Sequence, residues 1–231
     1  MIAVTFALPA ESSHFVRLLR DKTDHVQNGV STISGKIDNV AVEILHTGVG
    51  EKICTRRLER FLQDRQFEFL ISAGFAGALT DRLAAGELVF AKNFSTIAFA
   101  QPASKPTIHF ADLHTAAAMI DSADARKEMA RTTGAVAVDM ETQFIARICS
   151  EHALPMLSLR AISDTPSDPF PAPPDVLFNI TAQRTDMLKL AAFFLAHPNR
   201  IPRLIQFARR IGRAKEVLAK AVAEGISRQQ V

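Results

Sequence analysis

The chain has 231 residues, of which 48% are hydrophobic and 22% are charged, so it accommodates one folded domain and is not disordered. It contains no apolar run near the roughly 20 residues that a transmembrane helix needs. Its only cysteines, Cys54 and Cys149, exclude a disulfide framework, and a cytoplasmic location is expected. The net charge of +3 comes from basic residues at 200–220, which favours a solvated helix face over a nucleic-acid site.

Short β-branched runs alternate with longer segments of helical periodicity. Strands are expected at Ile2–Leu8, Gly29–Ser34, Val40–His46, Phe67–Ala73, Glu87–Phe94, Ala135–Val138 and Met156–Ile162. Helices are expected at Glu11–Arg20, Glu51–Gln63, Ala123–Thr132, Glu141–His152, Val176–Ala196 and Ile201–Gly225. The second and third strands resemble a hairpin joined through Lys36–Asn39.

This alternation predicts an α/β layer fold with a largely parallel sheet covered on both faces. We expect a single domain over residues 1–231, with 197–231 as a basic C-terminal helical extension. Residues 165–175 contain five prolines and must form a loop. Because this loop follows the carboxyl end of a strand, where ligands bind in open α/β sheets, it is either a lid or a plain connector.

Three carboxylates stand where a strand ends and a helix or loop begins. Glu11, Glu141 and Asp164 each follow an apolar strand, so all three should project from one rim of the sheet. Each one alone could be an acid stabilised by a helix dipole. Together they would form a costly cluster of like charges, which indicates a functional site.

Several motifs, in this order and spacing, resemble those of the purine nucleoside phosphorylase and methylthioadenosine/S-adenosylhomocysteine nucleosidase superfamily. They cover about residues 1–165 and are Ala7–Glu11, Thr47–Gly50, Ser72–Leu79, Ala85–Val89, Val138–Thr142 and Leu159–Asp164. The resemblance implies a three-layer α/β/α domain with a central mixed sheet and no cofactor. It also implies a homodimer, because the superfamily builds its pockets near subunit contacts.

The resemblance implies a role for each carboxylate. Glu11 would activate a water for attack on C1′, and Asp164, oriented by Ser163, would protonate or hydrogen-bond N7 of the purine. Glu141 would bind the ribose hydroxyls, with Met140 packed on the sugar. Protonation at N7 removes the penalty of expelling a purine anion, and a carboxylate near the ribose favours positive charge on the sugar. The remaining expected substrate contacts are Val49, Gly74, Phe75, Ala76, Met119, Val138 and Asp139.

Two departures from the superfamily bear on the nucleophile. Its phosphorylases place an arginine near the position of Ser72 and a serine near Phe75, and neither is present here. Loss of the guanidinium removes the best bidentate partner for phosphate and favours water. Arg17, Lys52 and Arg56 could supply charge instead, so phosphorolysis stays open.

A third departure concerns the base. The nucleosidases have a stacking aromatic residue in the stretch that corresponds to Ala116–Ile120, where this chain offers only small side chains and Met119. Phe75 or Phe170 could take over the stacking, or Phe75 and Met119 could simply fill the core.

The end of the chain also differs. His197–Ile205 and the basic amphipathic helix after it are reminiscent of a superfamily subgroup linked to hopanoid lipid synthesis, which removes adenine from adenosylhopane. Such a helix could rest on an anionic membrane or admit an apolar substrate. The simpler reading is that its apolar side packs on the sheet or on a second subunit.

We therefore expect a purine nucleosidase that acts on an adenosine-type nucleoside related to 5′-methylthioadenosine or S-adenosylhomocysteine. The alternatives are a phosphorolytic nucleoside phosphorylase, an adenosylhopane-cleaving enzyme and a non-catalytic nucleoside-binding protein. His109 and His114 lack the compact spacing of a zinc motif, so no metal site is expected.

Overall fold

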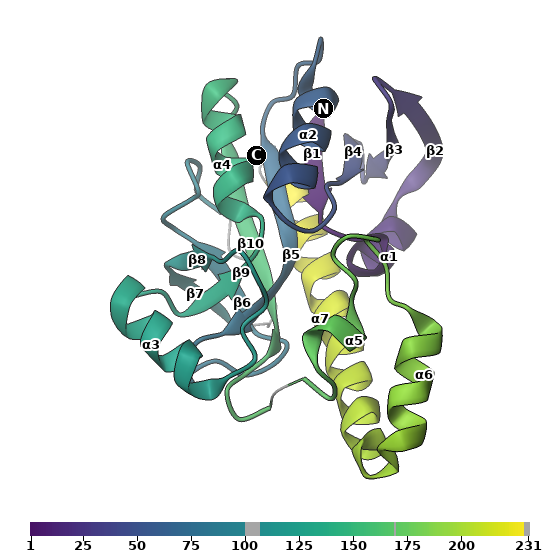
Figure 1. The fold of residues 1–231 in the computed structure, drawn as a ribbon. Coiled ribbons are helices and arrows are strands. Elements are labelled where there is room, and N and C mark those ends of the chain that lie inside the picture. Colours follow the sequence, from purple (N-terminus) through teal and green to yellow (C-terminus); the bar gives the residue numbers. More distant parts are fainter. Residues whose placement is uncertain (100–106, 169, 229–231) are drawn as a thin grey trace.

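In the computed structural model, residues 1–99, 107–168 and 170–228 are described. Within them, ten strands form one sheet (Figure 1). Their bounds are β1 (Ile2–Phe6), β2 (Arg20–Gln27), β3 (Val30–Ile37), β4 (Val40–His46), β5 (Leu70–Ala78), β6 (Leu88–Ala91), β7 (Ile108–Ala111), β8 (Leu113–Thr115), β9 (Ala137–Asp139) and β10 (Met156–Asp164).

The main path of the sheet runs β2-β3-β4-β1-β5-β10-β6-β7, and β9 joins it by pairing with β5 and β8. Strands β4, β1, β5 and β10 are parallel, whereas the β2–β3–β4 meander and the β10–β6 and β5–β9 pairs are antiparallel. The sheet is therefore mixed, which confirms the predicted fold class.

Seven α-helices and one 3-10 turn accompany the sheet in the described residues. Their bounds are α1 (Pro9–Leu18), α2 (Glu51–Leu62), α3 (Ala123–Thr133), α4 (Thr142–Glu151), α5 (Pro174–Leu177), α6 (Met187–Ala196), η1 (Pro198–Arg200) and α7 (Ile201–Arg228). None of these helices is long and apolar enough to cross a membrane.

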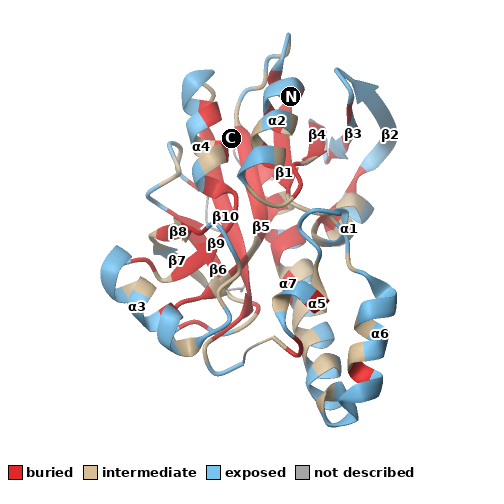
Figure 2. Ribbon diagram, viewed as in Figure 1, coloured by how far each residue is buried: buried red, intermediate tan, exposed pale blue. Residues whose placement is uncertain are grey.

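Two hydrophobic cores separate the three layers. Helices α1 and α7 cover one face of the sheet, where Phe15, Leu218 and Val222 pack against β1, β5 and β10. Helices α2 and α4 cover the other face through Leu58 and Ile148. In Figure 2 the central strands are buried along their length between these helices. The C-terminal half of α7 thus belongs to the main core, in line with the simpler reading of the basic helix.

Two sequence predictions were wrong. The first helix ends at Leu18, and residues 20–27 form strand β2, which is exposed throughout. A strand exposed on both faces has no alternating apolar pattern by which to recognise it. The helix predicted at 176–196 is split into α5 and α6. Asp186 interrupts it by capping α6, since its side chain accepts hydrogen bonds from the backbone N–H groups of Leu188 and Lys189.

Candidate active site

A pocket of about 470 Å³ opens at the carboxyl ends of the parallel strands and is called here the large pocket. Eleven of the twelve site residues expected from the sequence line it, and the twelfth, Gly74, lines a smaller cavity beside it. The eleven are Glu11, Val49, Phe75, Ala76, Met119, Val138, Asp139, Met140, Glu141, Ser163 and Asp164. The topology thus brings the three separated carboxylates to one rim.

Glu11 lies in the first turn of α1, a helix that starts with Pro9 at a position where the missing N–H costs nothing. Its Oε2 accepts a hydrogen bond of 3.3 Å from the backbone N–H of Ala7. Burial raises the pKa of Glu11 to about 7, and the nearby positive charge of Arg160 opposes this shift. A carboxyl group with a pKa near neutrality can act as a general base in the physiological range.

Glu141 stands at the N-cap of α4, and its Oε1 accepts a hydrogen bond of 2.9 Å from the backbone N–H of Gly50. Burial is the largest cause that raises its pKa to about 8, followed by the charge of Asp139, while the Gly50 bond acts in the opposite direction. Among the described residues the bond from Gly50 is the only hydrogen bond to this carboxyl group, so its second oxygen can accept from a ligand.

Arg160 on β10 links Asp139 to Ser72 on β5. Its Nε donates to Asp139 Oδ2 at 2.9 Å, and its Nη atoms donate to the carbonyl oxygen and Oγ of Ser72 at 2.7 and 2.8 Å. Asp139 also accepts hydrogen bonds from Thr115 and Thr142. Ser72, at the position where the phosphorylases have an arginine, is therefore engaged by Arg160 from β10, and the Asp139 carboxylate is shared between Arg160, Thr115 and Thr142.

The small cavity, of about 10 Å³, lies below the large pocket. The two share the lining residues Ala7, Glu11, Phe75 and Glu141. Gly74 allows the walls to approach closely, since a Cβ there would lie 3.2 Å from Glu11 Oε2 and 3.7 Å from Arg160 Cζ. Thr5 also lines the cavity, and its buried hydroxyl has no hydrogen-bond partner among the described residues. The volume is about that of one water probe, and the lining is polar enough to hold a water.

Asp164 ends β10 next to a β-bulge, because the pairing of β10 with β5 shifts between Ile162 and Asp164. The bulge re-aims the side chains of Ser163 and Asp164. Ser163 Oγ donates to Asp164 Oδ1 at 2.5 Å, the contact expected from the sequence. Asp164 Oδ2 pairs with the guanidinium of Arg126, which also donates to the carbonyl oxygens of Ala78 at 3.0 Å and Ile120 at 2.9 Å.

Arg126 and Arg160 were not predicted as site residues. Arg160 carries a signal in retrospect, because it is a lone cation in the middle of the apolar strand Met156–Asp164. Arg126 carries no such signal in the sequence, because α3 is charged along its length. In the structure Arg126 is nevertheless the one buried residue of that helix. The composition of α3 is typical of a surface helix, and only the tertiary fold places the Arg126 side chain in the interior.

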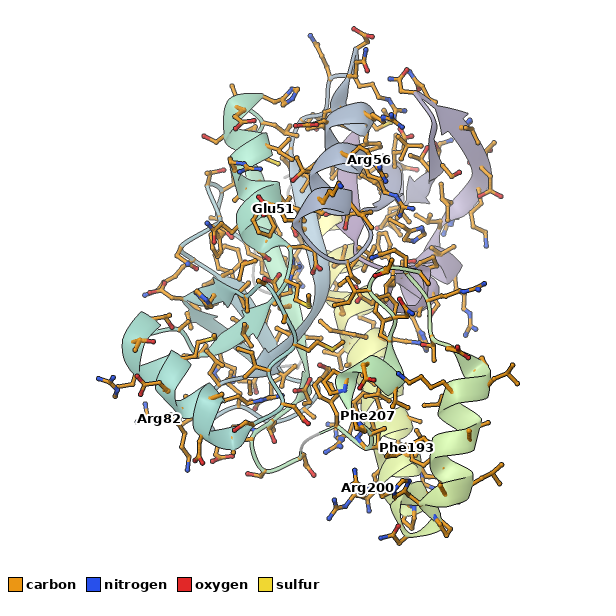
Figure 3. The ribbon with its side chains drawn as sticks, in the orientation of Figure 1. Glu51, Arg56, Arg82, Phe193, Arg200 and Phe207 are labelled. Atoms are coloured by element: carbon orange, nitrogen blue, oxygen red, sulfur yellow. The ribbon has the colours of Figure 1, made fainter. Side chains whose placement is uncertain are left out.

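The outer wall of the large pocket is apolar. It is built from side chains of α5, α6, α7 and the loops beside them, namely Phe170, Leu177, Phe178, Leu190, Leu204, Phe207, Ala208 and Ile211. Phe170 meets Phe207 edge-on at a centroid distance of 5.9 Å. In Figure 3, Phe207 is labelled on α7 beside α5. The aromatic side chains proposed to stack on a base, Phe75 and Phe170, both line this pocket.

The three cations that could have compensated for the missing phosphate arginine lie elsewhere. Arg17, Lys52 and Arg56 are exposed, and none lines the large pocket or the small cavity. Figure 3 shows Arg56 on α2. The guanidinium groups beside the site, Arg126 and Arg160, are each paired with a carboxylate. Among the described residues, no group of three or more His, Cys, Asp or Glu side chains could hold a metal ion.

The family model described as the phosphorylase superfamily matches residues 1–119 and 96–196. A 5′-methylthioadenosine/S-adenosylhomocysteine nucleosidase from Shewanella piezotolerans is 21% identical over 200 residues, which cover 72% of this chain and 87% of that protein. The nucleosidase of the same name from S. pneumoniae, solved with a transition-state inhibitor, superposes with a TM-score of 0.69 at 20% identity over 97% of each chain. Futalosine hydrolase from Helicobacter pylori gives a TM-score of 0.70 at 14% identity over 98% of this chain and 97% of its own.

The mixed sheet, with a carboxylate-lined pocket at its rim, is the architecture of an α/β protein with a small-molecule pocket at the carboxyl ends of its parallel strands. The match over most of the sequence makes the assignment definite: the chain belongs to the phosphorylase superfamily. This is a superfamily of nucleoside N-glycosidases and phosphorylases, and the fold is that of the methylthioadenosine/S-adenosylhomocysteine nucleosidases.

Proposed function

We propose that this protein hydrolyses the N-glycosidic bond of an adenosine-type nucleoside with a substituent at the 5′ carbon. The observation that carries the proposal is the small cavity, sized for one water, that Glu11, Glu141 and Arg160 enclose beneath the large pocket. Water held there would lie beneath a ribose bound against Glu141 and Met140. The similarity to nucleosidases that act on 5′-methylthioadenosine and S-adenosylhomocysteine supports the same substrate class.

In the proposed reaction, the bond between C1′ and the purine nitrogen breaks as the water oxygen bonds to C1′. Glu11 accepts a proton from that water, and its raised pKa of about 7 suits this role. Glu141 accepts hydrogen bonds from the ribose hydroxyls through the oxygen that Gly50 leaves open. Asp164, held by Ser163 and Arg126, faces N7. As the base leaves, N7 takes a proton from solvent water and the Asp164 carboxylate accepts a hydrogen bond from the new N–H, while Glu11 returns its proton to solvent. The products are the free base and the free sugar derivative.

Phosphorolysis is the weaker candidate because a phosphate dianion needs unpaired cations or a set of backbone N–H donors. Arg126 and Arg160 are both paired, and the small cavity is far too small for phosphate.

A second candidate substrate is favoured by the apolar outer wall of the large pocket. Side chains such as Leu190, Phe207 and Ile211 would surround the 5′ end of a nucleoside whose ribose contacts Glu141. A wall of this kind suits a hydrocarbon substituent better than the charged amino-acid group of S-adenosylhomocysteine. Adenosylhopane, the substrate of the subgroup that the C-terminal segment resembles, has such a substituent.

The test is base release from 5′-methylthioadenosine, S-adenosylhomocysteine, adenosine, inosine and a series of 5′-alkylthioadenosines, each with and without phosphate. Release without phosphate supports the proposal, and a rate that rises with alkyl chain length selects the apolar substrate. Release only with phosphate would identify a phosphorylase. Binding of these nucleosides without release from any of them would identify a nucleoside-binding protein.

A further inference from the structure

The helix α6 is apolar apart from Lys189, with the sequence MLKLAAFFLA. One side packs inward, where Leu190, Phe193 and Phe194 join Val176 and Leu204 in a small cluster. A helix that is apolar all round is normally buried on every side. In this structure most of its surface is exposed, as the pale colour of α6 in Figure 2 shows.

The outward side of α6 follows a helical repeat of apolar residues. Leu188, Ala191, Ala192 and Leu195 are spaced as neighbours on one helix face and all are exposed. Leu188 is 83% exposed and Leu195 is 84% exposed. Adjoining residues of the same hairpin add to this surface, with Met187 at 68%, Ile201 at 41% and Ile205 at 48%. We call Met187, Leu188, Leu195, Ile201 and Ile205 the apolar hairpin surface.

The charges of the same segment all have one sign. Between Met187 and Lys215 the chain carries seven lysines and arginines and not one aspartate or glutamate. Arg203, Arg209 and Arg213 are exposed on α7, and Arg200 lies near the end of the hairpin in Figure 3. Exposed apolar side chains bordered by cations are typical of a segment that lies in the interface of an anionic bilayer.

We propose that the α6–α7 hairpin docks on an anionic lipid surface, with the apolar hairpin surface inserted between headgroups and the arginines bound to phosphates. A second copy of the chain fits less well, because a symmetric contact would bring the same arginine-rich patch of each copy together. The 10 residues of α6 are too few to span a bilayer, which takes about 20, so the hairpin lies on the membrane.

This docking would also place the apolar wall of the large pocket near the membrane. Leu190 and Leu204, on the inner side of the same two helices, line the apolar wall of that pocket. An apolar molecule could therefore pass from the bilayer along the hairpin into the pocket. The docking itself does not depend on the proposed reaction, and it can be tested without any substrate.

The test is flotation of the full chain with vesicles of phosphatidylcholine alone and with vesicles that contain phosphatidylglycerol. We expect binding only to the anionic vesicles and a marked loss at high salt. The double variant Leu188→Ser/Leu195→Ser should lose about tenfold or more of the binding, because it removes two inserted hydrocarbon side chains. Arg203→Glu/Arg209→Glu should also weaken it.

Val26→Ser is the matched control, since Val26 is 76% exposed but lies on β2. It should bind vesicles as the wild type does, and all variants should melt like the wild type. Absence of binding to anionic vesicles, or equal binding by the double serine variant, would overturn the proposal. It would also be overturned if the wild type self-associates and the double variant is monomeric, since the surface would then be an interface between copies.

Discussion

The guanidinium of Arg126 and the carboxylate of Asp164 form an ion pair in which the two side chains are only 1% and 2% exposed. One partner comes from α3 and the other from the bulged end of β10. The pair ties a peripheral helix to the proposed proton-handling group, so α3 positions Asp164 as well as covering the sheet. Each buried ion is costly to desolvate and is compensated by its partner, so loss of one partner leaves an uncompensated charge.

Replacement of Arg126 by alanine should therefore destabilise the protein by about 3–5 kcal/mol, as urea unfolding would measure. Arg131→Ala is the matched control on the same helix, because Arg131 pairs with Glu128 at the exposed surface. That control should leave the unfolding midpoint unchanged. An Arg126→Ala variant as stable as the wild type would show that the pair is not buried as described.

Substitution of Gly77 tests how tightly the site is packed around Asp164 and Arg126. A Cβ at this position would lie 3.0 Å from Asp164 Oδ2 and 3.2 Å from Arg126 Nη1. Gly77→Ala should displace Asp164 and lower kcat by about 100-fold, since small misplacements of a reacting group are costly. Gly212→Ala is the control: a Cβ there meets nothing within 4 Å, and the substitution should raise stability by about 0.5–1 kcal/mol because Gly212 is in the helix α7. Full activity in Gly77→Ala would refute the close approach.

The raised pKa of Glu11 predicts how stability depends on pH. In the folded protein Glu11 keeps its proton up to about pH 7, whereas its ordinary pKa is 4.5. Between these values unfolding releases a proton, so the free energy of unfolding falls as the pH rises and levels off above the folded pKa. Glu141 acts in the same direction up to about pH 8.

His46 acts in the opposite direction, because burial lowers its pKa to about 4 and the folded protein binds fewer protons there than the unfolded chain. The measurement is therefore a comparison of thermal midpoints from pH 5 to 8 between the wild type and Glu11→Gln. The advantage of Glu11→Gln should grow with pH up to about 7 and then stay constant. A constant difference across the whole range would mean that Glu11 has an ordinary pKa.

The apolar outer wall of the large pocket should determine selectivity for the 5′ substituent. Ile211→Asn should lower kcat/KM for 5′-alkylthioadenosines with long chains by about tenfold, because it places a polar group against the hydrocarbon. The value for adenosine, which has no such chain, should stay within about twofold. Equal losses for both substrates would place Ile211 outside the site of the 5′ substituent.

Much of the fold was predictable because its buried strands and amphipathic helices have regular apolar patterns. The rim position of Glu11, Glu141 and Asp164 followed from their places after apolar strands, and the structure brings them into one pocket. Strand β2 was not predictable, since an exposed strand leaves no hydrophobic period. The break between α5 and α6 was not predictable either. Asp186 can cap a helix, but the sequence alone does not show that the chain turns at this position.

The residues that hold the predicted site residues in place, such as Arg126, could not be predicted from composition. Arg126 lies among the exposed residues Ala125, Lys127 and Glu128 of a charged helix, and nothing local marks it as the residue that faces Asp164. The outer pocket wall brings α5 and α6 against the N-terminal part of α7, a contact between segments that the sequence shows only as separate apolar runs. The roles of the predicted residues in catalysis and the homodimer stay predictions, as does the cytoplasmic location.

The most direct test of the central claim is adenine release from 5′-methylthioadenosine in buffer freed of phosphate by an enzymatic scavenger, with wild type and Glu11→Gln compared. We expect release by the wild type at a rate that added phosphate does not raise. We expect a loss of about 100-fold or more in Glu11→Gln, which removes the base from the attacking water. Release that requires phosphate, or a Glu11→Gln variant as active as the wild type, would contradict it.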